Sequence, residues 1–210
     1  MTKIKICGIT NYEDARNAAD LGADFLGFNF YSRSPRCVDL NTAKNIINKS
    51  DNLILKVGVF VNEKAEKIAE IADYCSLDLI QLSGQEDIDF VKSLKKSTGK
   101  QIVKCFHVRA KEDLKNLNCA AFDYIMLDTF ENGLHGGTGK TFNLNIAKNI
   151  DNKKMFLAGG LNERNVRAAI KKLNPFAVDV CSSIEKSTGI KDFKKMKNFI
   201  GAAKGIQGDF

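Results

Sequence analysis

The chain has 210 residues, 44% of them hydrophobic and 27% charged, and carries a formal net charge of +7. This composition is that of a folded domain with a substantial core, and it excludes a disordered or fibrous protein. No stretch approaches the roughly 18 apolar residues that indicate a membrane span, and no apolar signal peptide is recognisable, so we expect a cytoplasmic protein without a membrane partner.

Short apolar runs alternate with amphipathic stretches from one end of the chain to the other. The apolar runs predict strands at 3–7, 24–30, 53–61, 77–82, 101–108, 122–128, 154–160 and 177–181. The amphipathic stretches predict helices at 11–22, 41–49, 63–74, 85–96, 110–117, 143–149, 162–173 and 190–204. The strands are continuous apolar runs, a pattern typical of parallel strands that are buried on both faces.

Eight successive strand–helix units predict an α/β fold, namely a single-domain (β/α)8 TIM barrel that spans residues 1–210. The alternative is an open doubly wound sheet, which usually carries an early GxGxxG turn, and none follows the first strand. In a barrel, the residues that follow the strands form the functional face. Catalytic and binding side chains are therefore expected at the end of each apolar run.

Three side chains stand at such ends. Cys7 closes the first run, in KIKICGIT, and is either buried filler or a reactive thiol. Asp128 closes the sixth run, in LDT, and is either a turn cap or a general acid or base whose pKa burial would raise. Arg36 follows the second run, in RSPRCV, and offers its guanidinium either to an anionic ligand or to a surface salt bridge.

Glycine and hydroxyl residues follow the last two strands, in LAGGL and VDVCSSIE. TIM barrels commonly bind phosphate with these two loops, and glycines let backbone N–H groups approach the anion closely. The sequence therefore predicts a phosphate site at Gly159, Gly160, Ser182 and Ser183. The simpler interpretation is a tight turn followed by a helix cap at Ser182.

Other features exclude several functions. The lysines are dispersed rather than interleaved with aromatics, so we expect no nucleic-acid partner. The six cysteines have no zinc-site spacing, which predicts free thiols and no metal. His107 and His135 are interpreted as incidental. GGTGKT within 130–142 resembles part of a P-loop, but its spacing does not fit, so we expect a mobile flap there.

Taken together, eight stretches resemble the phosphoribosylanthranilate isomerase family of tryptophan biosynthesis: KICGIT, GFNFYSRSPR, VGVFVN, QLSGQE, LDT, GGTGKTF, LAGGL and VDVCSSIE. They occur in order from Lys3 to Glu185, through all eight predicted units. The resemblance implies an isomerase that needs no cofactor and converts N-(5-phosphoribosyl)anthranilate to 1-(2-carboxyphenylamino)-1-deoxyribulose 5-phosphate by an Amadori rearrangement, with a small phosphorylated molecule as its substrate.

Residue roles follow from the same resemblance. Cys7 would be the general base and Asp128 the general acid, and Arg36 would face the anthranilate carboxylate. The substrate phosphate would lie against the last two loops, with the predicted substrate-binding residues Gly159, Gly160, Asp179, Ser182 and Ser183.

The chain departs from the family pattern at three positions. The family usually has histidine where Ser83 stands, serine where Cys181 stands and glycine where Ser183 stands. A different phosphosugar barrel is the competing enzyme, but an aldolase would need a strand-end lysine, whereas Lys56 and Lys104 fall inside predicted strands. The sequence leaves open a monomer or a homodimer and activity on the related histidine-pathway aminoaldose.

Overall fold

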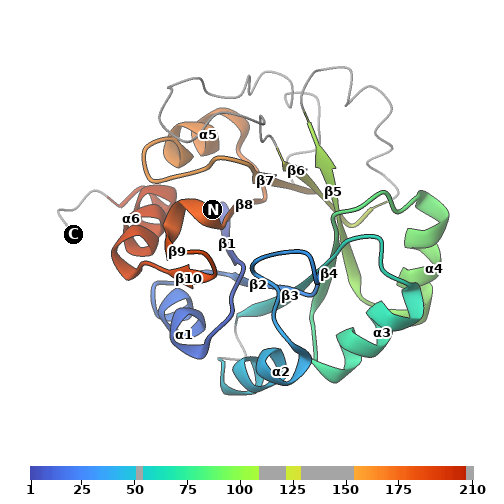
Figure 1. Cartoon of the computed structure of the whole chain (residues 1–210). Helices are drawn as coiled ribbons and strands as arrows, with labels where there is room; N and C mark the ends of the chain where they lie inside the picture. The colour runs from blue at the N-terminus through green and yellow to red at the C-terminus, as the bar shows by residue number, and fades with distance from the viewer. Residues whose placement is uncertain (51–53, 109–121, 129–153, 207–210) are drawn as a thin grey trace.

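The computed structural model describes residues 1–50, 54–108, 122–128 and 154–206. Eight parallel strands pair in chain order and close into a barrel, which confirms the predicted fold (Figure 1). The strands are β1 Lys3–Cys7, β2 Phe25–Asn29, β3 Leu55–Phe60, β4 Leu79–Leu82, β5 Gln101–His107, β6 Tyr124–Asp128, β7 Met155–Ala158 and β8 Ala177–Val180.

The described helices surround the strands (Figure 1). They are α1 Tyr12–Asp20, α2 Leu40–Lys49, α3 Ala65–Tyr74, α4 Ile88–Thr98, α5 Val166–Leu173 and α6 Phe193–Lys204. Capping fixes several of their first turns, since Asn11, Asp39 and Asp87 each accept a hydrogen bond from the backbone N–H three residues on. The predicted helices at 110–117 and 143–149, the predicted flap and His135 lie outside the described residues.

The segment after β8 differs from the prediction of a helix over 190–204. Residues Ser182–Ile184 form one 3₁₀ turn, and β9 Glu185–Ser187 pairs antiparallel with β10 Ile190–Lys191. Helix α6 begins only after Asp192, whose side chain accepts a hydrogen bond from the Lys195 N–H. The periodicity of the sequence did not separate this small hairpin from the helix that follows it.

Two layers of apolar side chains hold the fold together. One lies between the barrel and its helices, and the other fills the barrel interior, where it includes Phe25, Val57, Leu79, Met126 and Phe156. Aromatic rings close the amino-terminal end of the interior; those of Tyr124 and Phe176 stack with centroids 4.8 Å apart. Because side chains fill the interior, a ligand has room only at the carboxyl-terminal end of the strands.

Among the described helices, none combines the length and apolar character that crossing a membrane requires.

Candidate active site

Cys7 lies at the carboxyl end of β1, above a buried ion pair. Lys5, two residues earlier on the same face, is fully buried and donates from Nζ to Oδ1 of Asp179 on β8 over 2.7 Å. The register of the two strands places Lys5 directly beside Asp179. Burial acts to lower the pKa of Lys5, but the Asp179 carboxylate and the Cys7 sulfur outweigh it and raise that pKa, so the ammonium stays charged.

The neighbouring strand leaves room for these side chains because it has a glycine there. Gly27 on β2 pairs with Cys7, and a Cβ atom at Gly27 would lie 2.8 Å from Cys7 Sγ and 3.0 Å from Lys5 Nζ. Any larger residue would therefore have to displace the thiol or the ammonium. These contacts also show that the cation of Lys5 and the sulfur of Cys7 share one small space inside the barrel mouth.

The thiol of Cys7 is unusually acidic in this setting. Its pKa is lowered to about 6, first because Cys181 hydrogen-bonds to its sulfur and then because the Lys5 ammonium is close, while burial acts in the opposite direction. The pKa of Cys181 is raised by the same hydrogen bond, by burial and by the charge on Cys7. Since a thiolate is the reactive form of cysteine, the structure favours a reactive thiol at Cys7 over buried filler.

Asp128 lies at the same end of the barrel, on β6. Strands β7 and β8 separate β6 from β1, so the carboxyl group and the thiol face the mouth from different sides. Asp128 is in register with His107 on β5, and His107 Nδ1 lies 3.6 Å from Asp128 Oδ2. This is too long for a hydrogen bond but close enough for an attraction when the imidazole is charged. His107, interpreted as incidental, is thus a neighbour of the predicted acid.

One group of metal-type ligands occurs in the part of the chain that the structure describes. The sulfur of Cys105, a ring nitrogen of His107 and a carboxylate oxygen of Asp128 lie within 4.8 Å of one another. Cys105 lies inside the barrel below the other two, and burial, with the nearby Asp128 charge, raises its pKa to about 12. A zinc ion could use this set, although the thiol would have to lose its proton first.

Arg36 lies on the loop after β2 and reaches the barrel mouth. There it forms a bidentate salt bridge. Its Nε and Nη2 donate to the two carboxylate oxygens of Glu185 over 2.8 and 2.7 Å. A Cβ atom at Gly8 would lie 2.9 Å from Arg36 Cδ and 3.0 Å from Cys181 Sγ, so the arginine stem and the Cys181 thiol both lie next to Gly8. The salt bridge considered in the sequence is therefore present, but at the mouth rather than on the outer surface.

Glu185 connects the arginine to the hairpin after β8. Only 6% of its side chain is exposed, and it also accepts a hydrogen bond from Lys191 Nζ over 3.0 Å. Burial acts to raise its pKa, but Arg36 and Lys191 outweigh burial and hold that pKa below its usual range. The carboxylate therefore stays ionised and fixes the direction of Arg36.

The two predicted phosphate-binding loops lie next to each other. The hydroxyl of Ser183 donates to the Leu161 carbonyl, which ties the loop after β8 to the loop after β7. Gly159 and Gly160 have φ angles of 88° and 62°, values that glycine adopts without strain. Ser182, considered as a helix cap, instead begins the 3₁₀ turn, with its side chain exposed.

The lysines considered for a Schiff base lie within strands, as predicted, and are buried. Lys104 on β5 donates from Nζ to Glu86 and to the Gly84 carbonyl, over 2.7 Å in each case. Lys56 lies within β3 and is buried. Lys104 therefore has structural partners on the loop after β4.

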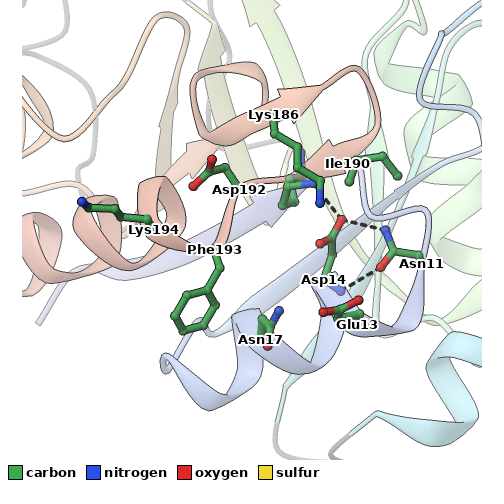
Figure 2. A pocket seen from close by; sticks show the side chains of 10 residues that line it. Asn11, Glu13, Asp14, Asn17, Lys186, Ile190, Asp192, Phe193 and Lys194 are labelled. Carbon is green, nitrogen blue, oxygen red and sulfur yellow. Dashed lines mark hydrogen bonds between the residues drawn. The ribbon is translucent and has the colours of Figure 1, made fainter. Parts of the chain in front are cut away.

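A separate depression of about 590 Å³ lies outside the barrel, between α1 and the hairpin that precedes α6 (Figure 2). Asn11 and Asp14, which hydrogen-bond to each other, are on one side of it, and Lys186 and Ile190 are on the other (Figure 2). It contains none of the predicted catalytic or substrate-binding residues. Because Asp14 also accepts the Lys191 N–H over 2.8 Å, this region is best explained as the anchor of the hairpin.

Sequence analysis missed three members of the site: Lys5, Glu185 as the partner of Arg36, and Cys181 as the partner of Cys7. The alternation in KIKIC places Lys5 and Cys7 on the same face of one strand, which was an available signal. No local signal identifies Asp179 as the partner of Lys5, because 174 positions separate them.

Comparisons with known proteins agree with this geometry. The sequence profile of the family described as N-(5'phosphoribosyl)anthranilate (PRA) isomerase matches residues 4–202. A protein of Aquifex aeolicus named N-(5'-phosphoribosyl)anthranilate isomerase is 44% identical over 208 residues, which cover 97% of this chain and 99% of the relative.

Solved structures agree as well. A phosphoribosyl anthranilate isomerase from Thermotoga maritima superposes with a TM-score of 0.90 at 40% identity and covers 98% of this chain and 100% of its own. Another phosphoribosyl anthranilate isomerase, in complex with reduced 1-(o-carboxyphenylamino)-1-deoxyribulose 5-phosphate, superposes with a TM-score of 0.88 at 37% identity, over 98% and 100% of the two chains.

Proposed function

The chain belongs to the N-(5'-phosphoribosyl)anthranilate isomerase family, and from this premise we propose which of its residues perform the reaction. The protein is an isomerase of tryptophan biosynthesis that catalyses the Amadori rearrangement of N-(5-phosphoribosyl)anthranilate by general acid–base catalysis. The proposal assigns the base to Cys7 and the acid to Asp128.

The reaction needs two proton transfers at different places on the sugar. Asp128 donates a proton to the ring oxygen of the ribose, the C1–O bond breaks, and the nitrogen lone pair forms a C1 iminium ion. The iminium makes the C2 proton acidic, and the Cys7 thiolate removes it to give an enolamine. The proton that Cys7 has taken then passes to C1, and the C2 hydroxyl proton returns to the Asp128 carboxylate, which yields the ketone. Acid and base return to their starting states, so no external reagent is consumed.

The positions of the two groups support this assignment. Cys7 and Asp128 lie at the mouth on β1 and β6, two strands that are not adjacent in the barrel. An acid on one side and a base on the other can serve the ring oxygen and C2 of one bound substrate without changing places. Each such proton transfer contributes on the order of 10²–10⁴ in rate.

The remaining predicted residues would bind the two ends of the substrate. Arg36 uses Nε and one hydrogen of Nη2 for Glu185, and its other guanidinium edge suits the anthranilate carboxylate. Gly159, Gly160, Ser182 and Ser183 would surround the phosphate with N–H and O–H donors. Asp179 is proposed to act indirectly, since its carboxylate holds Lys5 beneath Cys7. We further propose a cytoplasmic location, no nucleic-acid partner, and a monomer or a homodimer.

The observation that carries the proposal is the environment of Cys7, where the Cys181 thiol and then the buried Lys5 ammonium lower the pKa of Cys7 to about 6 and so favour the thiolate at neutral pH. The test compares Cys7→Ala and Asp128→Asn with Cys37→Ala, which removes an exposed thiol outside this environment. Both site variants should lose at least about 10²-fold in kcat with little change in KM, because each group acts on protons and binds no charge in the ground state.

Cys37→Ala should retain normal kinetics, and circular dichroism should show that all three variants fold. A Cys7→Ala enzyme that keeps more than about a tenth of the wild-type kcat would contradict the base assignment. An Asp128→Asn enzyme with near-normal kcat would contradict the acid assignment and indicate that Asp128 is only a turn cap.

A further inference from the structure

Cys7 and Cys181 are placed side by side by the register of β1 and β8. The ladder between these strands pairs Lys5 with Asp179 and Ile6 with Val180. Cys7 and Cys181 are the next residues on the two sides of this ladder, and Cys181 lies just past the end of β8. Neighbouring strands lie about 4.8 Å apart, within the range of about 4.4–6.8 Å that a disulfide requires between Cα atoms. The backbone spacing therefore already suits a covalent bond.

The two side chains point to the same place. Lys5 and Asp179 form their ion pair inside the barrel, and residues two positions further along each strand lie on the same face. Interaction between the two thiols lowers the pKa of Cys7 and raises that of Cys181, which requires the sulfurs to lie close together. A bond between them would not require either strand to turn or slide.

Cys7 is also the cysteine best suited to react first among those that the structure describes. Cys75 and Cys105 are buried, and burial raises the pKa of each. Cys37 is exposed, but partial desolvation and the charge of Asp39 raise the pKa of its thiol. Cys7 is partly accessible, and its lowered pKa makes it a thiolate at neutral pH, the form that oxidants attack.

We propose that Cys7 and Cys181 are a site of oxidative modification, a dithiol that peroxide converts to a disulfide at the barrel mouth. The Cys7 thiolate attacks one peroxide oxygen, the O–O bond breaks, and hydroxide leaves, which produces a sulfenic acid. The Cys181 sulfur then attacks the Cys7 sulfur, water leaves with the sulfenic oxygen, and the S–S bond forms. The two sulfurs together lose two electrons, and the peroxide gains them.

This modification would switch the enzyme off in a reversible way. A disulfide removes the thiolate that the proposed mechanism uses as its base, and a thiol reductant restores it. Cys181 would also protect Cys7, because a sulfenic acid that is captured as a disulfide does not proceed to the irreversible sulfinic acid. The loss of activity rests on the proposed role of Cys7, whereas formation of the disulfide does not.

The test treats the wild-type protein, Cys181→Ser and Cys37→Ser with excess hydrogen peroxide. Wild type and Cys37→Ser should become about 2 Da lighter, the mass of two hydrogen atoms, and a digest without reductant should contain a peptide pair that joins Cys7 to Cys181. Dithiothreitol should return each of them to its own untreated activity. Cys181→Ser should instead gain oxygen on Cys7 and stay inactive after dithiothreitol.

Several results would overturn the proposal. They are a wild-type protein that gains oxygen without losing hydrogen, a disulfide that joins Cys7 or Cys181 to another cysteine, or a Cys181→Ser variant that dithiothreitol rescues as fully as wild type. The mass measurement on wild type stands even if a variant fails to fold. A Cys7–Cys181 disulfide in a fully active enzyme would support the modification site and contradict the role of Cys7 as base.

Discussion

Replacing Cys181 with alanine should shift the pH range in which the enzyme is active and should not abolish its activity. The thiol of Cys181 is the largest single cause of the lowered pKa of Cys7, which is about 6. A hydrogen bond to a charged group contributes about 1.5–3 kcal/mol, which corresponds to about 1–2 pKa units at 1.36 kcal/mol each. Cys181→Ala should therefore move the pKa of Cys7 to about 7–8.

The kinetic consequence depends on pH. At pH 7 the thiolate fraction of Cys7 should fall from about 90% to between about 50% and 10%, so kcat/KM should fall about 2–10-fold. Well above pH 8 most of the thiol is ionised in both enzymes, and the loss should largely disappear. The sign follows from the base role: a higher pKa keeps the proton on Cys7 until a higher pH, so the acid limb of the profile moves upward.

The assay is kcat/KM from pH 5 to pH 9 for wild type, Cys181→Ala and Cys181→Ser, together with the pH dependence of Cys7 alkylation by iodoacetamide. Serine keeps a hydrogen-bond donor, so the Cys181→Ser limb should move less than that of Cys181→Ala. An acid limb that stays in place in Cys181→Ala, with alkylation unchanged, would refute the argument that Cys181 sets the acidity of Cys7.

Three further predictions concern groups around the thiol. Arg36→Met should raise KM and lower kcat/KM by a factor equivalent to about 1.5–3 kcal/mol, measured by steady-state kinetics, and an unchanged KM would remove Arg36 from the substrate site. Lys5→Met should lower the free energy of unfolding by about 3–5 kcal/mol, because it leaves Asp179 buried without its cation. The double variant Lys5→Met/Asp179→Leu should recover much of that loss in urea titrations, and equal stability of wild type and Lys5→Met would show that the ion pair contributes little. Inorganic phosphate and sulfate should inhibit competitively with the substrate, and anion density in a crystal should lie between Gly159–Gly160 and Ser182–Ser183; density only elsewhere would contradict the predicted phosphate site.

The fold could be predicted because its signal repeats. Each strand–helix unit shows the same apolar run, and a (β/α)8 barrel fixes which end of each run is functional. Cys7 and Asp128 could therefore be singled out without knowing any distance. The extent of the domain, residues 1–210, stays a prediction. The hairpin after β8 was missed because two short strands beside a 3₁₀ turn have too few residues for a periodicity to appear.

The partners of these residues could not be predicted, for a physical reason. A charged side chain in a strand normally indicates the solvent-facing side, so the sequence gives no reason to expect Lys5 inside the barrel. Its burial is tolerable only because Asp179 lies 2.7 Å away, and that proximity exists only once the last strand closes the barrel against the first. Glu185 and Arg36, 149 positions apart, meet for the same reason.

These contacts affect whether Cys7 and Asp128 carry, at neutral pH, the charges that their proposed roles as base and acid require. An ordinary aspartate titrates near 3.9 and an ordinary cysteine near 8.5, so at neutral pH both would carry the wrong charge for an acid at Asp128 and a base at Cys7. In the structure, Cys181 and Lys5 lower the pKa of Cys7 to about 6, so Cys7 is ionised at neutral pH as a base must be. What is still required at neutral pH is a proton on Asp128, whose neighbour His107 lies 3.6 Å away. Cys7 is therefore already in the charge state that a base needs at neutral pH. Of the two catalytic groups, only Asp128 still needs a change of protonation state to fill its proposed role.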